Sequence, residues 1–335
     1  MPLTIEWNGG ISIEHHGTGI VFDPQRNHNH SSKVFITHAH RDHSKGFAFR
    51  NCQRFSSDET KQIAEAYWKK IDFWQPLQPG SRTKVDDLEV VSHNAGHILG
   101  STMFEAITPE GNIVYTGDLQ SKDSLTLRGA EPILCDILII ESTFGSASFK
   151  FPEREVVAHE MIEWAKKTIR KKKIPAFKTD SLGNAQEITK AFNMYSELPV
   201  TVHPRVALIN KLYNVKGQSL EFIDSDPKDA LDVISSGECI FIAPKNTDLT
   251  HCSRFEQALV SGWALWTRRD RSAFPLSDHA DFGQLTEFVI ACKPKTVLTC
   301  FGGRFNYELA EHIQKQLGIE ARPLDLIPSK FIFEA

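Results

Sequence analysis

The stretch Val34-Phe35-Ile36-Thr37-His38-Ala39-His40-Arg41-Asp42-His43 places three histidines and an aspartate directly after an apolar segment. Alternate residues of an extended chain point to one side, so His38 and His40 can offer imidazole nitrogens to one metal ion. Asp42 and His43 follow the end of the expected strand, where a turn can direct both toward a second ion. Neutral imidazole suits zinc and its transition-metal neighbours, and a carboxylate adds charge without closing the open position that catalysis needs. The spacing therefore predicts a binuclear metal site.

Two later segments supply further candidate ligands. In Gly96-His97-Ile98-Leu99-Gly100 the flanking glycines let the backbone pass close to a buried site, so His97 is the natural third nitrogen for the first ion. In Tyr115-Thr116-Gly117-Asp118 the aspartate comes directly after an expected strand, where one carboxylate can bridge two ions. We expect the first ion to be held by His38, His40, His97 and Asp118. We expect the second to be held by Asp42, His43 and the shared Asp118.

Composition bounds the class of protein. A chain of 335 residues with 41% hydrophobic residues can form two domains, or one domain with a large insertion. No window approaches the apolar length of a membrane span, and Met1-Pro2-Leu3-Thr4-Ile5-Glu6-Trp7 lacks a basic region followed by an apolar stretch. We therefore expect neither a membrane protein nor a secreted one. Six scattered cysteines without a Cys-x-x-Cys pair are typical of thiols in a reducing compartment, so we expect a cytoplasmic location.

The charge balance leaves nucleic acid open as a partner. With 42 acidic and 38 basic residues the formal net charge is −4, which argues weakly against a polyanionic partner. Two divalent ions would bring the sum to zero (−4 + 4 = 0) and would concentrate positive field at the site itself.

The pattern along the chain changes twice. Short strands are expected at 3–7, 11–14, 19–22 and 33–37, broken by Gly9-Gly10, Gly17 and Asp23-Pro24. A helix is expected at 59–71, and more strands at 88–92, 102–107, 113–116 and 137–140. After Pro152, helices alternate with short apolar strands, as in a small parallel sheet covered by helices. The last section returns to the chemistry of the first with another His-Asp cluster. We predict an α/β protein with a first part at 1–149, an inserted domain at 150–272 and a return segment at 273–335.

The ordered set His-x-His-x-Asp-His, Gly-His and Gly-Asp resembles the metallo-β-lactamase superfamily, whose fold is an αββα sandwich. This resemblance covers residues 1–145. Glu141 in Ile139-Ile140-Glu141-Ser142-Thr143 and His279 in Leu276-Ser277-Asp278-His279-Ala280-Asp281 are similar to the extra acidic and histidine motifs of the β-CASP nucleases. In that group a smaller α/β (β-CASP) domain is inserted into the lactamase fold and clamps nucleic acid over the metals. The resemblance then spans nearly the whole chain and implies a metal-dependent hydrolase of phosphodiester bonds.

Within this group the chain most resembles the prokaryotic DNA-ligase-associated exonucleases. The similar segments are Glu141 to Gly145, the turn Leu182-Gly183-Asn184-Ala185-Gln186, and Ser261-Gly262-Trp263. The resemblance implies a DNA exonuclease in DNA repair or processing that associates with a DNA ligase or helicase. We expect one tightly held Zn²⁺ and a weaker second ion, with Mn²⁺ or Mg²⁺ as alternatives. The preference for a strand end rests on the resemblance alone.

The residues support hydrolysis of a phosphodiester independently. A water held by two metal ions has a pKa near neutrality, and the ions offset the phosphate charge. The leaving oxygen then needs a proton, and His279 is the candidate acid because imidazole titrates near neutral pH. Glu141 can orient His279 and favour its protonated form. The candidate catalytic residues are therefore Asp42, Glu141 and His279.

One position departs from the family pattern. RNA-cutting members commonly carry a histidine after a late strand and before a glycine, as a ligand to the second ion. Here Leu298-Thr299-Cys300-Phe301-Gly302 places Phe301 at that position, so we expect a weakly held second ion and favour DNA over RNA. Cys300 is an alternative soft ligand, but its neighbouring position in a strand points the other way.

Three other functions stay open at this point. The first is an RNA-processing endo- or exoribonuclease of the same fold. The second is a catalytically silent nucleic-acid scaffold, against which the complete set of first-ion ligands argues. The third is a small-molecule hydrolase acting on a thioester or lactam, which would need neither the insert nor the motifs of Glu141 and His279.

Overall fold

The computed structural model describes residues 3–26, 33–49, 52–66, 70–226, 228–267, 272–324 and 331–333. They form two compact units. The first unit takes in residues 1–122, 128–150 and 279–335, and the second takes in residues 123–127 and 151–278. The part of the chain that the structure describes contains no helix with the length and apolar character needed to cross a bilayer.

The first sheet of the first unit carries the metal-ligand motif. Its strands, in spatial order, are β20(Phe331–Phe333), β1(Leu3–Trp7), β2(Ile11–His15), β3(Thr18–Phe22), β4(Lys33–Phe35), β5(Gln53–Ser56) and β6(Trp74–Pro76). Strands β20 to β3 pair antiparallel and β3 to β6 pair parallel. The 3₁₀ turn η1(Ser44–Ala48) follows the motif. Helix α1(Asp58–Glu65) begins at Ser57, whose hydroxyl accepts a hydrogen bond from the backbone N of Thr60.

The second sheet carries the remaining candidate residues of this unit. Its strands, in spatial order, are β19(Glu320–Pro323), β18(Thr296–Cys300), β11(Ile137–Glu141), β10(Gly111–Tyr115), β9(Thr102–Thr108), β8(Leu88–Asn94) and β7(Arg82–Val85). Strands β7 to β10 pair antiparallel, and β10, β11, β18 and β19 pair parallel. Helices α7(Phe282–Cys292) and α8(Arg304–His312), the latter continued by the π turn η2(Ile313–Leu317), complete the unit.

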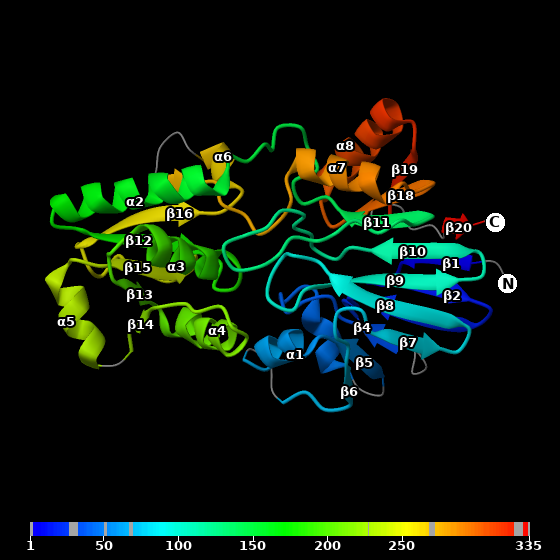
Figure 1. Ribbon diagram of the computed structural model, residues 1–335, viewed down its shortest axis with the longest axis horizontal. Coiled ribbons are helices and arrows are strands. Elements are labelled where there is room, and N and C mark those ends of the chain that lie inside the picture. Colours follow the sequence, from blue (N-terminus) through cyan, green and yellow to red (C-terminus); the bar gives the residue numbers. More distant parts are fainter. Residues whose placement is uncertain are drawn as a thin grey trace. The chain divides into compact units, whose positions relative to one another are not determined.

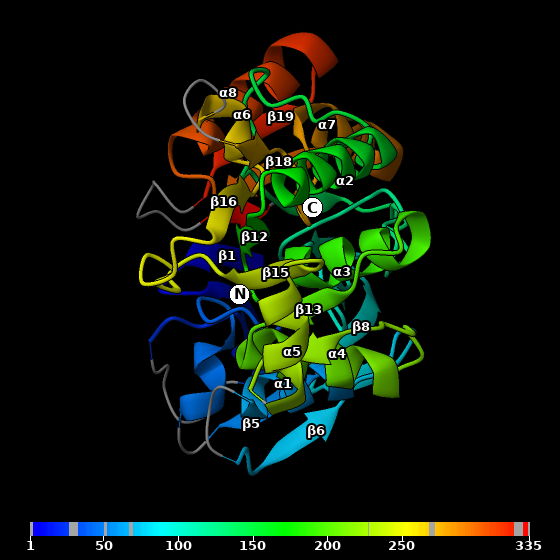
Figure 2. The same ribbon diagram turned by 90° about the vertical axis from the view of Figure 1, so that its left-hand side faces the viewer.

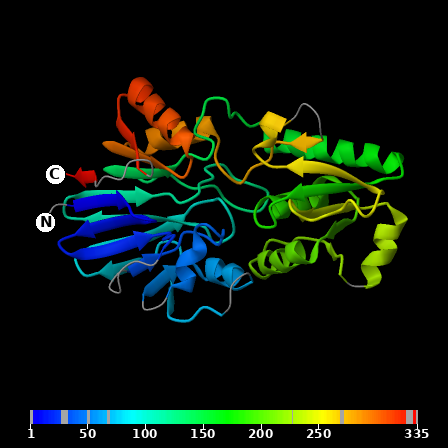
Figure 3. The same ribbon diagram turned by 180° about the vertical axis from the view of Figure 1, so that it is seen from behind.

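The two sheets face each other across one apolar core, to which both contribute large side chains. Examples are Phe22, Phe35, Phe104, Tyr115 and Leu298. The other face of the second sheet packs against α7 and α8 through a separate apolar cluster (Figure 1). Figure 3 shows strands β1 to β3 of the first sheet, coloured dark blue, from the opposite side. Burial of each such side chain contributes about 1.5–3 kcal/mol, so these two clusters hold the layers together. The expected αββα sandwich, combined with a smaller α/β unit, is confirmed.

The second unit is built on one parallel sheet. Its strands, in spatial order, are β14(Ile223–Asp224), β13(Val200–Val202), β15(Ile240–Pro244), β12(Ile174–Thr179), β16(Phe255–Val260) and β17(Ala273–Phe274). Its helices are α2(Arg154–Arg170), α3(Asn184–Tyr195), α4(Pro204–Val215), α5(Lys228–Ser236) and α6(Ala264–Thr267). Helices α2, α3 and α4 share one apolar cluster with the sheet, while α5 packs against another that includes Phe241 (Figure 2). Strands buried by helices on both faces explain the continuous apolar runs in this part of the sequence.

Two expected boundaries differ from the structure. The return to the first unit comes after residue 278 rather than at 273, because Ala273 and Phe274 form β17 and extend the sheet of the second unit. The helix expected at 59–71 is shorter, since α1 ends at Glu65. The Glu65 carboxylate instead accepts a hydrogen bond from the backbone N of Ile71.

Candidate metal centre

Four predicted ligands of the first ion lie together. His38 and His40 follow β4, His97 lies in the connection from β8 to β9, and Asp118 follows β10. One ligand atom from each of these four residues lies within 4.8 Å of those from the others. The structure therefore brings together side chains that are up to 80 positions apart in the sequence (118 − 38 = 80).

The distances define a compact pocket of donors. Asp118 Oδ2 lies 3.3 Å from His38 Nε2 and 3.6 Å from His97 Nε2. His97 Nε2 is in turn 3.0 Å from His40 Nδ1. Three imidazoles and one carboxylate thus converge, which is a donor set that zinc and neighbouring divalent ions accept.

His38 shows that these residues fit a cation. The Thr37 hydroxyl donates to Asp23, so it accepts from His38 Nδ1 at 2.9 Å, and this leaves His38 Nε2 as a lone pair. That nitrogen is fully buried and makes no hydrogen bond. Burial, followed by the charges of the surrounding histidines, holds the pKa of His38 well below its usual value, so the ring stays neutral. A buried imidazole lone pair without a donor costs free energy, and a divalent ion would satisfy it.

His43 lies on the other side of the same carboxylate. Its Nε2 is 3.3 Å from Asp118 Oδ1, whereas His38 and His97 face Oδ2. Asp118 thus separates the two predicted ligand groups, as a bridging carboxylate would. Asp42 lies at the open edge: its Oδ2 is 3.9 Å from His43 Nε2 and its side chain is 71% exposed.

The electrostatics of this pocket couple Asp118 and His43. Burial raises the pKa of Asp118 to about 6, although the charge of His43 opposes the shift. Burial lowers the pKa of His43, but the charges of Asp118 and Asp23 raise it by a larger amount, so the pKa is about 10. Without a cation, then, the proton on His43 balances the buried carboxylates. A bound divalent ion would replace that proton as the compensating charge.

Asp23 is a site residue that the sequence did not indicate. This buried carboxylate accepts hydrogen bonds from Thr37 N (2.8 Å), Thr37 Oγ1 (2.6 Å), His43 Nδ1 (2.7 Å) and Tyr115 Oη (2.9 Å). It therefore fixes the orientation of His43 and, through Thr37, that of His38. In the sequence Asp23-Pro24 reads only as the end of a strand.

The predicted acid and its partner lie next to this cluster. His279 Nδ1 donates to Glu141 Oε1 at 2.8 Å, and His279 Nε2 is 3.8 Å from Asp118 Oδ2. Glu141, the last residue of β11, also accepts from the backbone N of Leu119 and of Thr143. Burial raises the pKa of Glu141, but the charge of His279 and these hydrogen bonds lower it by a larger amount. The Glu141 carboxylate is therefore ionised.

Two glycines allow the backbone to approach this closely. Gly117 has φ +54°, and a Cβ there would lie 2.8 Å from the side chain of Thr37. Gly96 has φ +71°, and a Cβ would lie 2.2 Å from the carbonyl O of Gln120. Gly117 directly precedes Asp118, and Gly96 directly precedes His97. Because a glycine has no Cβ, the backbone can approach its neighbours here, and this close approach positions the ligand that follows.

The late strand places Phe301 against His43. Their ring centroids are 4.7 Å apart. The neighbouring Cys300 is fully buried, and its Sγ contacts the carbonyl O of Ile140 at 3.4 Å. Cys300 thus belongs to the apolar core between the two sheets, which argues against it as a substitute ligand.

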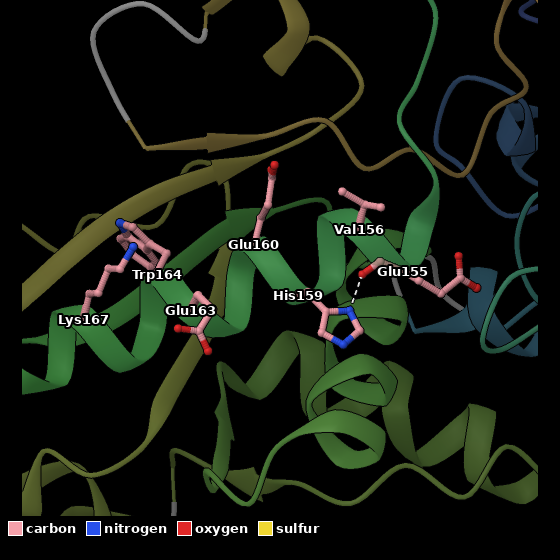
Figure 4. Close-up of a pocket in the computed structure, with 7 residues that line it drawn as sticks. All are labelled: Glu155, Val156, His159, Glu160, Glu163, Trp164 and Lys167. Carbon is pink, nitrogen blue, oxygen red and sulfur yellow. Dashed lines mark hydrogen bonds between the residues drawn. The ribbon is translucent and has the colours of Figure 1, made fainter.

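A surface pocket of about 690 Å³ lies along α2 (Figure 4). The residues that line it all belong to this helix: Glu155, Val156, His159, Glu160, Glu163, Trp164 and Lys167. None of them is a predicted ligand or catalytic residue. His159 Nδ1 is directed at the backbone O of Glu155, as the dashed line in Figure 4 shows, so it is not turned toward a convergent set of donors.

Comparisons with known proteins give relatives along most of the chain. A probable DNA ligase of Opitutus terrae is 28% identical, covering 96% of this chain and 31% of the ligase. An RNase J-like protein of Methanocaldococcus jannaschii is 31% identical, covering 48% of this chain and 43% of that protein. Transcription termination factor FttA of the same organism is 31% identical, covering 46% of this chain and 30% of FttA. No protein-family model matches the chain.

A solved structure extends the comparison to the fold. A protein of unknown function from Enterococcus faecalis covers 99% of this chain with a TM-score of 0.68, and this chain covers 100% of that one. At 14% identity it shows a common fold only. The chain spans between 30% and 43% of the length of the three relatives above.

A two-sheet sandwich with His38, His40, His97 and Asp118 gathered beside its strand ends defines the metallo-β-lactamase class of proteins. With Glu141 and His279 beside these residues, the chain is similar to the β-CASP group of the metallo-β-lactamase superfamily, and its relatives include the RNase J-like protein and FttA.

Proposed function

We propose that this protein is a metal-dependent nuclease that hydrolyses phosphodiester bonds, and that its substrate is DNA. The observation that carries the hydrolytic role is the buried lone pair of His38 Nε2, which lies among three further donors and next to the His279–Glu141 pair. A structural role alone would not require a histidine–carboxylate pair beside a cation pocket.

The proposed ligands are those expected from the sequence. His38, His40, His97 and Asp118 would hold one divalent ion, and Asp42, His43 and Asp118 a second. Ions bound there would acidify a water molecule and offset the charge of the scissile phosphate. Zn²⁺ suits the nitrogen-rich set, and Mn²⁺ or Mg²⁺ are alternatives for the more oxygen-rich second set.

His279 would supply the proton to the leaving oxygen. Its Nδ1–H is held by the Glu141 carboxylate, so its Nε2–H is the proton that can be transferred. Nε2 faces Asp118 at 3.8 Å and is therefore on the side where a substrate phosphate would lie. After the transfer the ring is neutral, and Glu141 still fixes the tautomer with the hydrogen on Nδ1. Asp42, exposed at the edge of the pocket, completes the proposed catalytic residues.

The choice of DNA rests on two observations. The chain aligns over 96% of its length with part of a probable DNA ligase, which supports a role in DNA repair or processing and an association with a ligase or helicase. Phe301 replaces the second-site histidine of RNA-cutting members. RNase J-like relatives support the alternative, an RNA-processing nuclease. We also propose that the second unit, residues 123–127 and 151–278, is the inserted β-CASP domain that the sequence predicted at 150–272. We further propose that the protein works in the cytoplasm and that it acts from a strand end.

One experiment tests these proposals together. The purified protein is incubated with 5′- and 3′-labelled single- and double-stranded DNA and RNA of matched sequence, with Zn²⁺, Mn²⁺ or Mg²⁺. We expect DNA to shorten stepwise from one end, and no cleavage by His38→Ala. The matched control is His159→Ala on α2, which should cleave as the unmodified protein does. Cleavage of RNA alone would establish the alternative. Binding without cleavage of either strand type, whichever metal is present, would show a scaffold.

A further inference from the structure

Three turns of the sandwich meet around a second group of possible ligands. His15 ends β2, and His16 follows it in the turn to β3 with φ +48°. Asp87 lies in the turn from β7 to β8, and Glu110 in the turn from β9 to β10. The β2–β3 turn belongs to the first sheet and the other two to the second, so this group joins both sheets of the first unit.

The side chains are close and well buried at their centre. The His15 ring is only 2% exposed. Its Nδ1 lies 2.6 Å from Asp87 Oδ2, and its Nε2 lies 2.7 Å from Glu110 Oε2. The exposed His16 ring stacks on it, with centroids 4.2 Å apart and planes inclined by 23°. Ligand atoms of His15, His16 and Glu110 all lie within 4.8 Å of one another.

The short contact between His15 Nε2 and Glu110 Oε2 indicates that a positive charge lies between the two atoms. Asp87 accepts the Nδ1–H of His15, so the neutral ring presents a lone pair at Nε2. His15 Nε2 and Glu110 Oε2 are both buried and lie 2.7 Å apart, and neither atom has another hydrogen-bond partner. A lone pair and a carboxylate oxygen that face each other at 2.7 Å repel unless a positive charge lies with them.

Two positive charges fit this arrangement. One is a proton on His15 Nε2: burial lowers the pKa of His15, but Glu110 and Asp87 raise it by more. The other is a metal ion. The carboxylate at Nδ1 is the arrangement that orients metal-binding histidines, and a ring nitrogen of His16 lies within 4.8 Å of the ligand atoms of His15 and Glu110. A proton on His15 would not explain why the exposed His16 ring stacks on the ring of His15. A metal ion would, because His16 could supply a second nitrogen.

We propose that His15, His16 and Glu110 bind a divalent transition-metal ion, with Asp87 orienting His15. Two imidazoles and one carboxylate suit Zn²⁺, Co²⁺ or Ni²⁺ better than Mg²⁺ or Ca²⁺. The ion would tie the β2–β3 turn of one sheet to the β9–β10 turn of the other. It would therefore act on stability and not on the cleavage chemistry.

Co²⁺ titration of metal-stripped protein at pH 8 tests the proposal, because visible absorption reports each nitrogen-bound Co²⁺. We compare the unmodified protein with His16→Ala, Glu110→Gln and the control His251→Ala, an exposed histidine of the second unit. The unmodified protein and His251→Ala should bind one more equivalent than His16→Ala and Glu110→Gln. Added Zn²⁺ should raise the Tm of the first pair by several degrees more than that of the second. Nuclease activity on metal-loaded protein should be the same in all four.

Equal Co²⁺ stoichiometry and equal Tm shifts in all four proteins would overturn the proposal and leave a proton as the shared charge. His16→Ala changes only an exposed ring, so it serves if Glu110→Gln folds poorly. Because metal content and Tm are read without a substrate, the outcome does not depend on whether the protein is a nuclease.

Discussion

The ring of Phe301 lies against the imidazole of His43, with centroids 4.7 Å apart and planes inclined by 35°. Phe301 also meets Trp7 edge to face, with centroids 5.4 Å apart. An apolar ring therefore fills the space beside the second ligand group. Only Asp42, His43 and the shared Asp118 remain there as proposed donors, and Asp42 is largely exposed.

Replacing Phe301 by histidine should strengthen binding of the second ion. We expect Phe301→His to raise the metal content after dialysis from about one equivalent toward two, since an imidazole adds a donor next to His43. Phe301→Leu is the control, because it keeps an apolar side chain without a donor. Elemental analysis of the dialysed proteins measures the effect. If the unmodified protein already keeps two ions with equal affinity, another residue supplies the missing ligand and the argument from Phe301 to DNA fails.

Replacing Asp23 by asparagine should damage both stability and metal binding. The Asp23 carboxylate accepts all four of its hydrogen bonds. The amide NH₂ of asparagine is a donor, so it would face other donors and leave some of these bonds unmade. We expect a loss of about 1–3 kcal/mol in the free energy of unfolding and a loss of about 10–100-fold in metal affinity. Tyr115→Phe removes only one of the four bonds and should cost less in both measurements. Urea unfolding and metal titration of the three proteins decide it, and an unchanged metal affinity in Asp23→Asn would remove Asp23 from the site.

Gly117→Ala should displace Asp118. The added methyl would lie 2.8 Å from Thr37 at a φ of +54°, so both the contact and the backbone conformation are unfavourable. Gly80→Ala is the matched control: its φ is +82°, and no atom lies within 4 Å of its added Cβ. Both variants should unfold at lower urea concentration, but only Gly117→Ala should also lose metal affinity. Equal metal affinities would mean that Asp118 reaches the pocket without this close approach.

Short-range patterns made much of this site predictable. His38 and His40 are two positions apart after a strand, and glycines precede both His97 and Asp118, so each ligand carries a local signal. Asp23 carries none, because an aspartate before a proline looks like any strand end. Its partners Thr37, His43 and Tyr115 are 14, 20 and 92 positions away, and only the folded chain brings them together.

Apolar patterns predicted most strands and helices, and the resemblance to the metallo-β-lactamase superfamily implied the αββα layers, whereas two boundaries differ from the structure. Ala273 and Phe274 form too short a strand to be recognised from sequence, so the expected end of the second unit, residue 272, lies six residues before the observed end at residue 278 (278 − 272 = 6). Similarly, the apolar spacing beyond Glu65 continues as in a helix, although α1 ends there. Pairing with other strands and side-chain capping decide such ends, and neither is a local property.

Glu105 should make the stability of the first unit fall in acid. The hydrogen bond from His93 lowers the pKa of Glu105, and burial opposes the shift. Because the folded-state pKa lies below the unfolded value of 4.5, this contribution is complete above about pH 4.5 and is lost as pH falls through the folded-state pKa. Urea unfolding between pH 6 and pH 3.5 should show a smaller decline in Glu105→Gln than in the unmodified protein. The same decline in both would show that Glu105 does not contribute.

His279→Ala should slow cleavage without emptying the metal pocket. His279 is not one of the proposed metal ligands: its Nδ1 is bonded to Glu141, although its ring centroid lies 4.5 Å from that of His97. Loss of a positioned proton donor should lower the single-turnover cleavage rate by roughly 10²-fold or more. Metal content and strand affinity should stay near those of the unmodified protein and of the His159→Ala control.

The variant Glu141→Gln tests whether Glu141 acts by orienting the His279 ring or by favouring the protonated form that donates to the leaving oxygen. Glutamine can still accept the His279 hydrogen bond through its amide oxygen but lacks the charge that favours imidazolium, so its cleavage rate should fall between those of the unmodified protein and His279→Ala. A substrate whose leaving group needs no proton, such as a p-nitrophenyl phosphodiester, should be cleaved by His279→Ala at close to the normal rate. If that substrate is slowed as much as DNA, His279 is not the proton donor and acts instead by shaping the pocket.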